Sequence, residues 1–158
     1  MEHSGAFSFM VPMNEIQNNL YLGGILAARN HQLLQSHRIN SIVCALSGFE
    51  MYEYFPEINY HRIYIDDTPA SNIKQYLKDA VEFIDIELKI GRNVLVHCAA
   101  GISRSSSIVV AYLMAKYSLT YEEALARVKK GRPCACPNIG FERQLRSLDI
   151  KELQSCLK

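Results

Sequence analysis

The chain has 158 residues, of which 17 are Lys or Arg and 16 are Asp or Glu, so its formal charge is +1. This balance argues against a nucleic-acid-binding protein, because such proteins use clustered basic side chains to neutralise phosphates. With 49% apolar residues the chain can bury the core of one domain. Its longest stretch without a charged side chain, Ile16 to Ala28, is too short to span a membrane.

Five cysteines, an odd number, occur in a chain that begins without the basic and apolar segments of a secretory signal. Both features favour free thiols, so we expect a cytoplasmic protein, with entry into the nucleus left open. Cys134 and Cys136 lack a second pair at a zinc-like spacing, so we expect no metal site. We expect a disordered leader over residues 1–12 and one domain over residues 13–158.

Four compact apolar runs predict strands, because they are short and rich in β-branched residues. They cover residues 19–22, 39–46, 58–65 and 93–98. Strands that alternate with helices imply crossover connections. We therefore expect an α/β domain, with a mainly parallel twisted sheet of about five strands flanked by helices on both faces. Ligands bind such sheets beyond the carboxyl ends of the strands, here after Leu46, Ile65 and His97.

Helices are predicted in the second half of the chain. Apolar side chains three or four positions apart predict one over residues 72–88. A second, more apolar helix covers residues 106–117, and a capping box predicts a third over residues 120–131. Asn138 opens a last helix, whose buried side is predicted to hold Phe141, Leu145, Leu148 and Leu153.

The segment HCAAGISRS, from His97 to Ser105, joins the last predicted strand to the apolar helix. Six successive backbone amides between a strand and a helix N-terminus favour a bound anion. Gly101 provides the backbone freedom that such a turn requires. We therefore predict a phosphate-binding loop formed by Ala99, Ala100, Gly101, Ile102, Ser103 and Arg104.

Cys98 begins this loop and Arg104 ends it. The amides, the helix and Arg104 together stabilise a thiolate, which is the nucleophilic form of cysteine. Arg104 can also hold a phosphate in the planar fork of its guanidinium. The alternative is a buried thiol and a surface cation without function. The strand–loop–helix placement of both residues favours attack of Cys98 on phosphorus.

HCAAGISRS resembles the HCxxGxxR[ST] signature of the cysteine-dependent protein tyrosine phosphatase superfamily, and its AGISRS ending is similar to the dual-specificity branch. Similar segments extend over most of the chain, from residues 19–23 to residues 132–141. The chain thus resembles the small, single-domain atypical dual-specificity phosphatases. That resemblance implies dephosphorylation of phosphotyrosine, phosphoserine and phosphothreonine in phosphoprotein substrates, through a phosphocysteine and without a metal or other cofactor.

Other functions remain open at this point. The same chemistry on a phosphoinositide, an RNA 5′-phosphate or a glucan is one alternative, although the loop lacks the Lys that lipid-directed relatives often carry. A non-catalytic phospho-residue binding module is another. We expect no nucleic-acid partner and no membrane span, and the sequence does not predict an oligomeric state.

The resemblance also implies a general acid, because the departing oxygen of the ester needs a proton. Asp67 matches the family's acid on a loop upstream of Cys98, and Asp66 is the alternative. Ser105 matches the hydroxyl that stabilises the Cys98 thiolate as it leaves.

Four further expectations concern residues around the loop. The resemblance implies that His97 orients the loop without acting as the acid. Asn138 is predicted first to be the N-cap of the last helix, and it is also a candidate for shaping the site. The aromatic residues Tyr52, Tyr54 and Phe55 fit core packing better than a substrate groove. A regulatory disulfide between Cys44 and Cys98 is a further idea.

Overall fold

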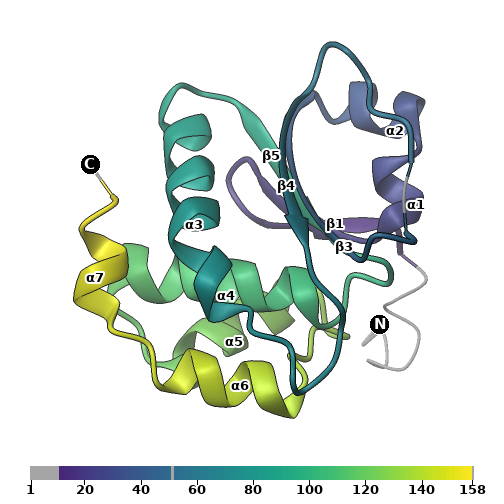
Figure 1. Ribbon diagram of the computed structural model, residues 1–158. Coiled ribbons are helices and arrows are strands. Elements are labelled where there is room, and N and C mark those ends of the chain that lie inside the picture. Colours follow the sequence, from purple (N-terminus) through teal and green to yellow (C-terminus); the bar gives the residue numbers. More distant parts are fainter. Residues whose placement is uncertain (1–10, 51, 158) are drawn as a thin grey trace.

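The computed structural model describes residues 11–50 and 52–157 of the chain. A five-stranded sheet runs through its middle in the order β1-β2-β5-β3-β4 (Figure 1). The strands are β1 (Met13–Gln17), β2 (Leu20–Gly23), β3 (Ile39–Leu46), β4 (Asn59–Tyr64) and β5 (Asn93–His97). β2, β5, β3 and β4 pair in parallel, whereas β1 pairs antiparallel with β2. The predicted mainly parallel sheet is confirmed.

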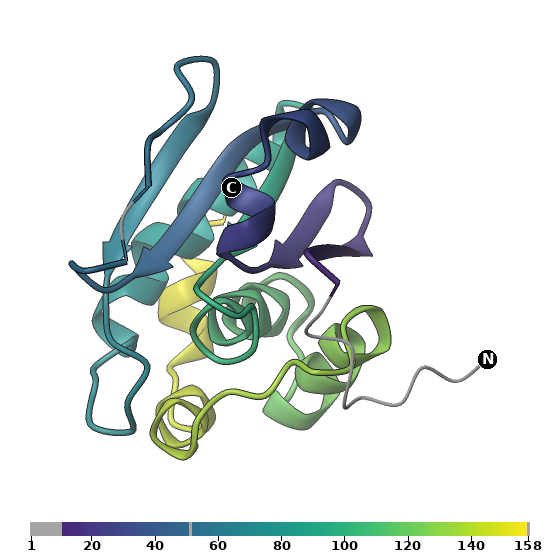
Figure 2. The ribbon, with the colours of Figure 1, turned by 90° about the vertical axis from the view of Figure 1, so that its right-hand side faces the viewer.

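Helices cover both faces of the sheet, as predicted. On one face lie α1 (Ile25–Ala28) and α2 (His31–Ser36), which stand in front of the strands in Figure 2. The other face carries α3 (Lys74–Lys89), α4 (Arg104–Tyr117), α5 (Tyr121–Gly131), α6 (Ile139–Arg146) and α7 (Ile150–Gln154). α4 contacts α3, α5, α6, α7 and the sheet. This central position explains its apolar sequence, since 12 of its 14 residues are buried.

Sequence and structure agree closely where the local signal is strong. The predicted strand over residues 39–46 coincides with β3, and the other three predicted strands differ by one residue at their ends. The capping box is also present: Thr120 accepts from the Glu123 amide and Glu123 accepts from the Thr120 amide, both at 3.2 Å. No helix of the described residues is long and apolar enough to cross a membrane.

The predicted last helix is wrong in extent, because it is two helices. α6 begins after its N-cap Asn138, as predicted, but ends at Arg146. Asp149 then caps α7 by accepting from the Glu152 amide at 3.3 Å. A short polar side chain that satisfies a free amide starts a new helix more readily than it continues an old one.

β1, α1 and α2 were not predicted from the sequence. β1 is a short edge strand in which Met13 alone is buried, so it lacks a clear apolar alternation. α1 and α2 have four and six residues, too few for a helical period to show. Residues 1–10 of the expected leader lie outside the described residues. Pro12, at its end, accepts a hydrogen bond from the Gly24 amide at 3.0 Å.

Candidate active site

The site lies where the carboxyl ends of three parallel strands meet the N-terminus of α4. Cys98 directly follows β5. Arg104, the first residue of α4, donates to Glu50 in the turn after β3 and to the Ile65 carbonyl after β4. The turns after Leu46, Ile65 and His97 therefore converge, as strands of one parallel sheet require.

The loop from Cys98 to Ser103 is tightly bent around the thiol. The Gly101 amide donates to Cys98 Sγ at 3.3 Å. Gly101 has a φ of +71°, and a Cβ there would lie 2.6 Å from the Gly23 backbone. A side chain at position 101 is therefore excluded both by conformation and by space.

Ser105 lies next to Cys98, the predicted nucleophile. Its Oγ is 3.1 Å from Cys98 Sγ, and both side chains are buried. A hydroxyl in this position can donate to a thiolate while Cys98 is negatively charged. The arrangement fits the role that the family resemblance implies for Ser105.

Arg104 is held by a partner that the sequence analysis missed. Its Nη1 and Nη2 donate to the two carboxylate oxygens of Glu50 at 2.7 and 3.2 Å. These hydrogen bonds lower the pKa of Glu50 to about 2, so Glu50 is a carboxylate at neutral pH. Nothing in the local sequence marked this residue, because the contact joins positions 54 apart in the chain.

One edge of the Arg104 guanidinium remains available to a substrate. Arg104 Nε is a buried side-chain atom without a hydrogen-bond partner among the described residues. Glu50 binds the edge formed by Nη1 and Nη2, so the edge formed by Nε and Nη2 is left for a phosphate. An unpaired buried donor is costly unless a ligand satisfies it. The structure therefore refines the prediction for Arg104: the edge formed by Nε and Nη2 is free for a phosphate, whereas the edge formed by Nη1 and Nη2 is occupied by Glu50.

His97 stabilises the loop from the opposite face of the sheet. Burial lowers its pKa to about 4, so the ring is neutral at physiological pH. With this protonation, Nδ1 donates to the Cys98 carbonyl at 3.0 Å and Nε2 accepts from the Tyr52 hydroxyl at 2.8 Å. Tyr52, which fitted core packing in the sequence, thus fixes the orientation of His97.

Asn138 connects the phosphate loop to the predicted acid. Its backbone amide donates to Ser103 Oγ and its side-chain Nδ2 donates to Asp67 Oδ1, both at 2.9 Å. Its Oδ1 caps α6 by accepting from the Phe141 amide. Asp66 has no side-chain hydrogen bond within residues 11–50 and 52–157. The structure therefore places Asp67, and not Asp66, in contact with a residue of the site.

Close packing keeps the segment after β4, which contains Asp67, against α6. A Cβ at Gly140 would lie 1.9 Å from the Pro69 carbonyl oxygen, so only glycine fits between the two segments. This contact holds the segment after β4 near the N-terminus of α6. Asp67 is consequently presented to the site from a fixed loop.

Arg132, at the start of the segment 132–141 that resembles the family, is a buried positioning residue. It is 0% exposed. Nε donates to the Gly101 carbonyl at 2.8 Å and Nη2 donates to the Ala100 carbonyl at 3.2 Å. Nη1 donates to the Val11 carbonyl and to Asn14 Oδ1, both at 2.8 Å. Arg132 thus ties the predicted phosphate loop to Val11 and to Asn14 of β1.

Arg132→Lys is expected to lower the free energy of unfolding by about 3 kcal/mol, because one ammonium cannot satisfy acceptors on four residues. Urea denaturation measures this loss. Arg127→Lys, the same change on the exposed face of α5, is the control and is expected to stay within about 0.5 kcal/mol of the parent. Equal effects of the two substitutions would contradict the role given to Arg132.

Cys44 and Cys98 lie on opposite faces of the sheet, which argues against a disulfide between them. Cys44 pairs in register with His97, and its side chain joins the core beneath α1 and α2. Cys98 joins the core formed with α3 to α7. Adjacent residues of a strand alternate in direction, so the sheet separates the two sulfur atoms. No group of three or more His, Cys, Asp or Glu suited to a metal occurs within residues 11–50 and 52–157.

Comparison with known proteins identifies the family. Residues 20–151 match the model of the dual specificity phosphatase catalytic domain. The chain is 40% identical to dual specificity protein phosphatase 1 of Arabidopsis thaliana, over 85% of this chain and 67% of that protein. It is 38% identical to dual specificity protein phosphatase 22-B of Danio rerio, over 90% of this chain and 76% of that protein.

Solved structures agree with this assignment. The crystal structure of DUSP15 superposes with a TM-score of 0.85 at 34% identity, covering 92% of this chain and 94% of that one. The human tyrosine phosphatase-like serine/threonine/tyrosine-interacting protein gives a TM-score of 0.81 at 37% identity, covering 85% and 93%. The chain belongs to the dual specificity phosphatase family of protein phosphatases.

Proposed function

We propose that this protein hydrolyses phosphate monoesters on Tyr, Ser and Thr side chains of proteins through a phosphocysteine intermediate. One observation carries the proposal: the Cys98 thiol faces a loop whose amide donates to it, beside an arginine whose buried Nε has no partner among residues 11–50 and 52–157. This arrangement supplies a nucleophile and an anion site at one point.

In the first step the Cys98 thiolate attacks phosphorus, and the bond between phosphorus and the ester oxygen breaks. Arg104 and the loop amides hold the phosphate oxygens. Asp67, protonated at this stage, donates its proton to the departing oxygen. The dephosphorylated side chain leaves, and phosphorus stays bound to Cys98 Sγ.

In the second step a water molecule attacks phosphorus, and the Asp67 carboxylate accepts a proton from it. The bond between sulfur and phosphorus breaks, which releases inorganic phosphate and regenerates the thiolate. Ser105 Oγ, 3.1 Å from the sulfur, donates a hydrogen bond to the thiolate as it leaves. The enzyme returns to its starting state.

Fold similarity alone does not separate an enzyme from a binding module, since the tyrosine phosphatase-like interacting protein shares the fold. The residues of the site favour the enzyme. A module that only holds a phosphate needs the amides and Arg104, but has no use for a buried thiol in contact with a hydroxyl or for a positioned carboxylate. This chain has all of these groups.

The test is a comparison of turnover on matched phosphotyrosine and phosphothreonine peptides, beside a phosphoinositide and an RNA 5′-phosphate, with and without EDTA. We expect both peptides to be hydrolysed, with kcat/KM at least about tenfold above the lipid and the RNA, and no loss with EDTA. A higher kcat/KM on the lipid or on the RNA would instead identify that molecule as the substrate class. Activity that disappears with EDTA would contradict the mechanism.

A further inference from the structure

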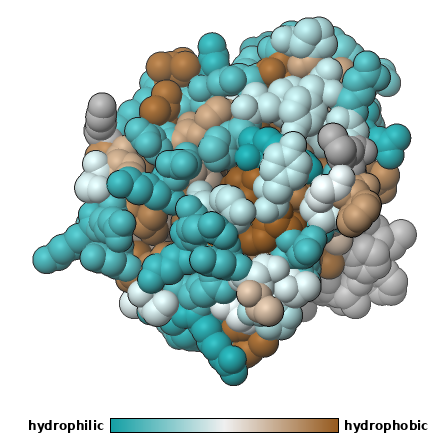
Figure 3. Space-filling view, viewed as in Figure 1, coloured by the Kyte–Doolittle hydropathy of each residue, from teal (hydrophilic) through white to brown (hydrophobic). Residues whose placement is uncertain are grey.

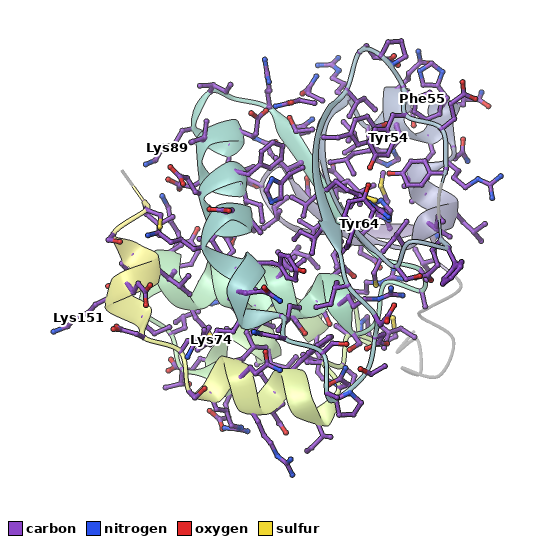
Figure 4. All side chains as sticks on the ribbon, in the orientation of Figure 1. Tyr54, Phe55, Tyr64, Lys74, Lys89 and Lys151 are labelled. Atoms are coloured by element: carbon purple, nitrogen blue, oxygen red, sulfur yellow. The ribbon has the colours of Figure 1, made fainter. Side chains whose placement is uncertain are left out.

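A second arginine lies beside the active site, on the opposite face of the sheet. Arg62 of β4 lines a pocket of about 320 Å³ together with Tyr52, Tyr54 and Tyr64. We call this the Arg62 pocket. Tyr54 and Tyr64 lie on the side of β4 that faces α1 and α2 (Figure 4). In the same orientation, that part of the surface is paler, and so less hydrophilic, than the area over α3 and α6 (Figure 3).

The Arg62 side chain is fixed without being neutralised. Its Nη1 donates to Cys44 Sγ at 2.8 Å and its Nη2 donates to the Ser47 carbonyl at 3.1 Å. Its Cζ lies 4.3 Å from the centre of the Tyr64 ring. Within residues 11–50 and 52–157 no carboxylate forms an ion pair with it. A half-buried cation without a carboxylate partner keeps its attraction for an anion.

Tyr54 adds a neutral hydrogen-bond donor beside Arg62. Burial, with the neighbouring Cys44 as a smaller cause, raises the pKa of Tyr54 to about 12. The same causes raise the pKa of Tyr52 further. Both hydroxyls therefore stay protonated at physiological pH, but the single proton of Tyr52 is donated to His97 Nε2, so Tyr54 is the tyrosine left to donate to a ligand. The Arg62 pocket thus presents one guanidinium and the phenolic donor of Tyr54, which is the chemistry that recognises a carboxylate or a phosphate.

One short turn joins the Arg62 pocket to the catalytic arginine. The Ser47 carbonyl accepts from Arg62 and from the Glu50 amide, the latter at 3.2 Å. The Ser47 amide and hydroxyl donate to Glu50 Oε1 at 2.9 and 2.8 Å, and the same oxygen accepts from Arg104. Tyr64, in addition, precedes Ile65, whose carbonyl accepts from Arg104. A peptide that crosses the sheet at the carboxyl ends of β3 and β4 therefore passes both the Arg62 pocket and the active site.

We propose that the Arg62 pocket binds a second anionic side chain of the phosphoprotein substrate, a carboxylate or a phosphate, a few residues from the one being dephosphorylated. The inference rests on the proposed function and names a preference within it: substrates with an acidic or a second phosphorylated residue near the target. Because the charge of Arg62 is local, the near-neutral total charge of the chain does not oppose this preference.

The experiment uses phosphotyrosine peptides with alanine flanks, in which one glutamate or one phosphoserine is placed in turn at the four positions on each side. The kcat/KM for phosphotyrosine is measured from tyrosine fluorescence. Binding of the same labelled peptides to the Cys98→Ser variant is measured by fluorescence anisotropy. Each value is expressed relative to the all-alanine peptide on the same protein, which cancels any general effect of a substitution on activity.

We expect at least one acidic position to raise the relative kcat/KM and the relative affinity by about tenfold, the effect of one charge-assisted hydrogen-bonded pair. Arg62→Gln should reduce both gains to near unity. Arg127→Gln is the matched control, because Arg127 also lies over a tyrosine ring, that of Tyr117, but on α5. It should keep both gains. The glutamate and phosphoserine series show which anion is preferred.

The proposal is overturned if no acidic position improves binding to the Cys98→Ser variant, or if Arg62→Gln leaves the improvement intact. Failure of the proposed function gives a different result, because no phosphotyrosine peptide would then be hydrolysed by the parent protein. The anisotropy measurement still decides on the Arg62 pocket in that case, since it does not require turnover.

Discussion

Cys98→Ser is expected to lower kcat on an aryl phosphate by at least about 10⁴-fold while the protein still binds inorganic phosphate. A serine hydroxyl is not ionised at neutral pH, whereas a cysteine thiol is partly ionised even without activation, and here it faces the Gly101 amide and Ser105. The amides and Arg104, which hold the anion, are unchanged. Steady-state turnover and the rise in Tm with added phosphate measure the two parts separately.

Cys156→Ser is the control for this substitution. Cys156 is another buried thiol, in the turn after α7, where its sulfur contacts the Glu152 carbonyl. It lies outside the site, so its replacement is expected to leave kcat within about twofold of the parent. A Cys98→Ser variant that retains more than about 1% of the parent rate would remove Cys98 from the role of nucleophile.

Asp67→Asn is expected to reduce kcat on a phosphothreonine peptide by about 10² to 10⁴, the usual contribution of a general acid. The loss on an aryl phosphate with a good leaving group should be much smaller, because that oxygen departs without protonation. Asparagine preserves the size of the side chain and its contact with the Asn138 amide group. The ratio of the two losses therefore reports on proton donation and not on folding.

Asp66→Asn is the matched control one position away. Asp66 is exposed, and its side chain has no hydrogen-bond partner among residues 11–50 and 52–157. We expect its substitution to change neither rate by more than about twofold. A larger loss of kcat for Asp66→Asn than for Asp67→Asn would show that Asp66, and not Asp67, is the general acid.

The strands and the loop could be predicted because their signals are local. Compact runs such as residues 39–46 and 93–98 are apolar along their length because α-helices cover both faces of the sheet. The Cys98 to Arg104 spacing predicts an anion loop because it follows such a strand and precedes a helix. In contrast, β1 depends on pairing with β2 for its stability, so its own sequence carries little signal.

Glu50, Tyr52 and Arg132 show what local sequence does not reveal about the site. Each acts on the catalytic loop across a distance in sequence: Glu50 on Arg104, Tyr52 on His97, and Arg132 on Gly101. A glutamate in a turn or a tyrosine in a loop has no residue pattern that indicates its partner. Only the folded sheet, which brings the ends of β3, β4 and β5 together, defines these pairs.

The sequence by itself determined the fold class, and it predicted a phosphate-binding loop with its thiol and arginine, because periodicity and a contiguous motif are properties of neighbouring residues. The tertiary structure decided which edge of Arg104 is free, that Asp67 contacts Asn138, and that Cys44 faces away from Cys98. It also placed Arg62 in a pocket next to the site. These relations depend on which strands are adjacent and which face a side chain takes, and the packing of the whole chain settles both.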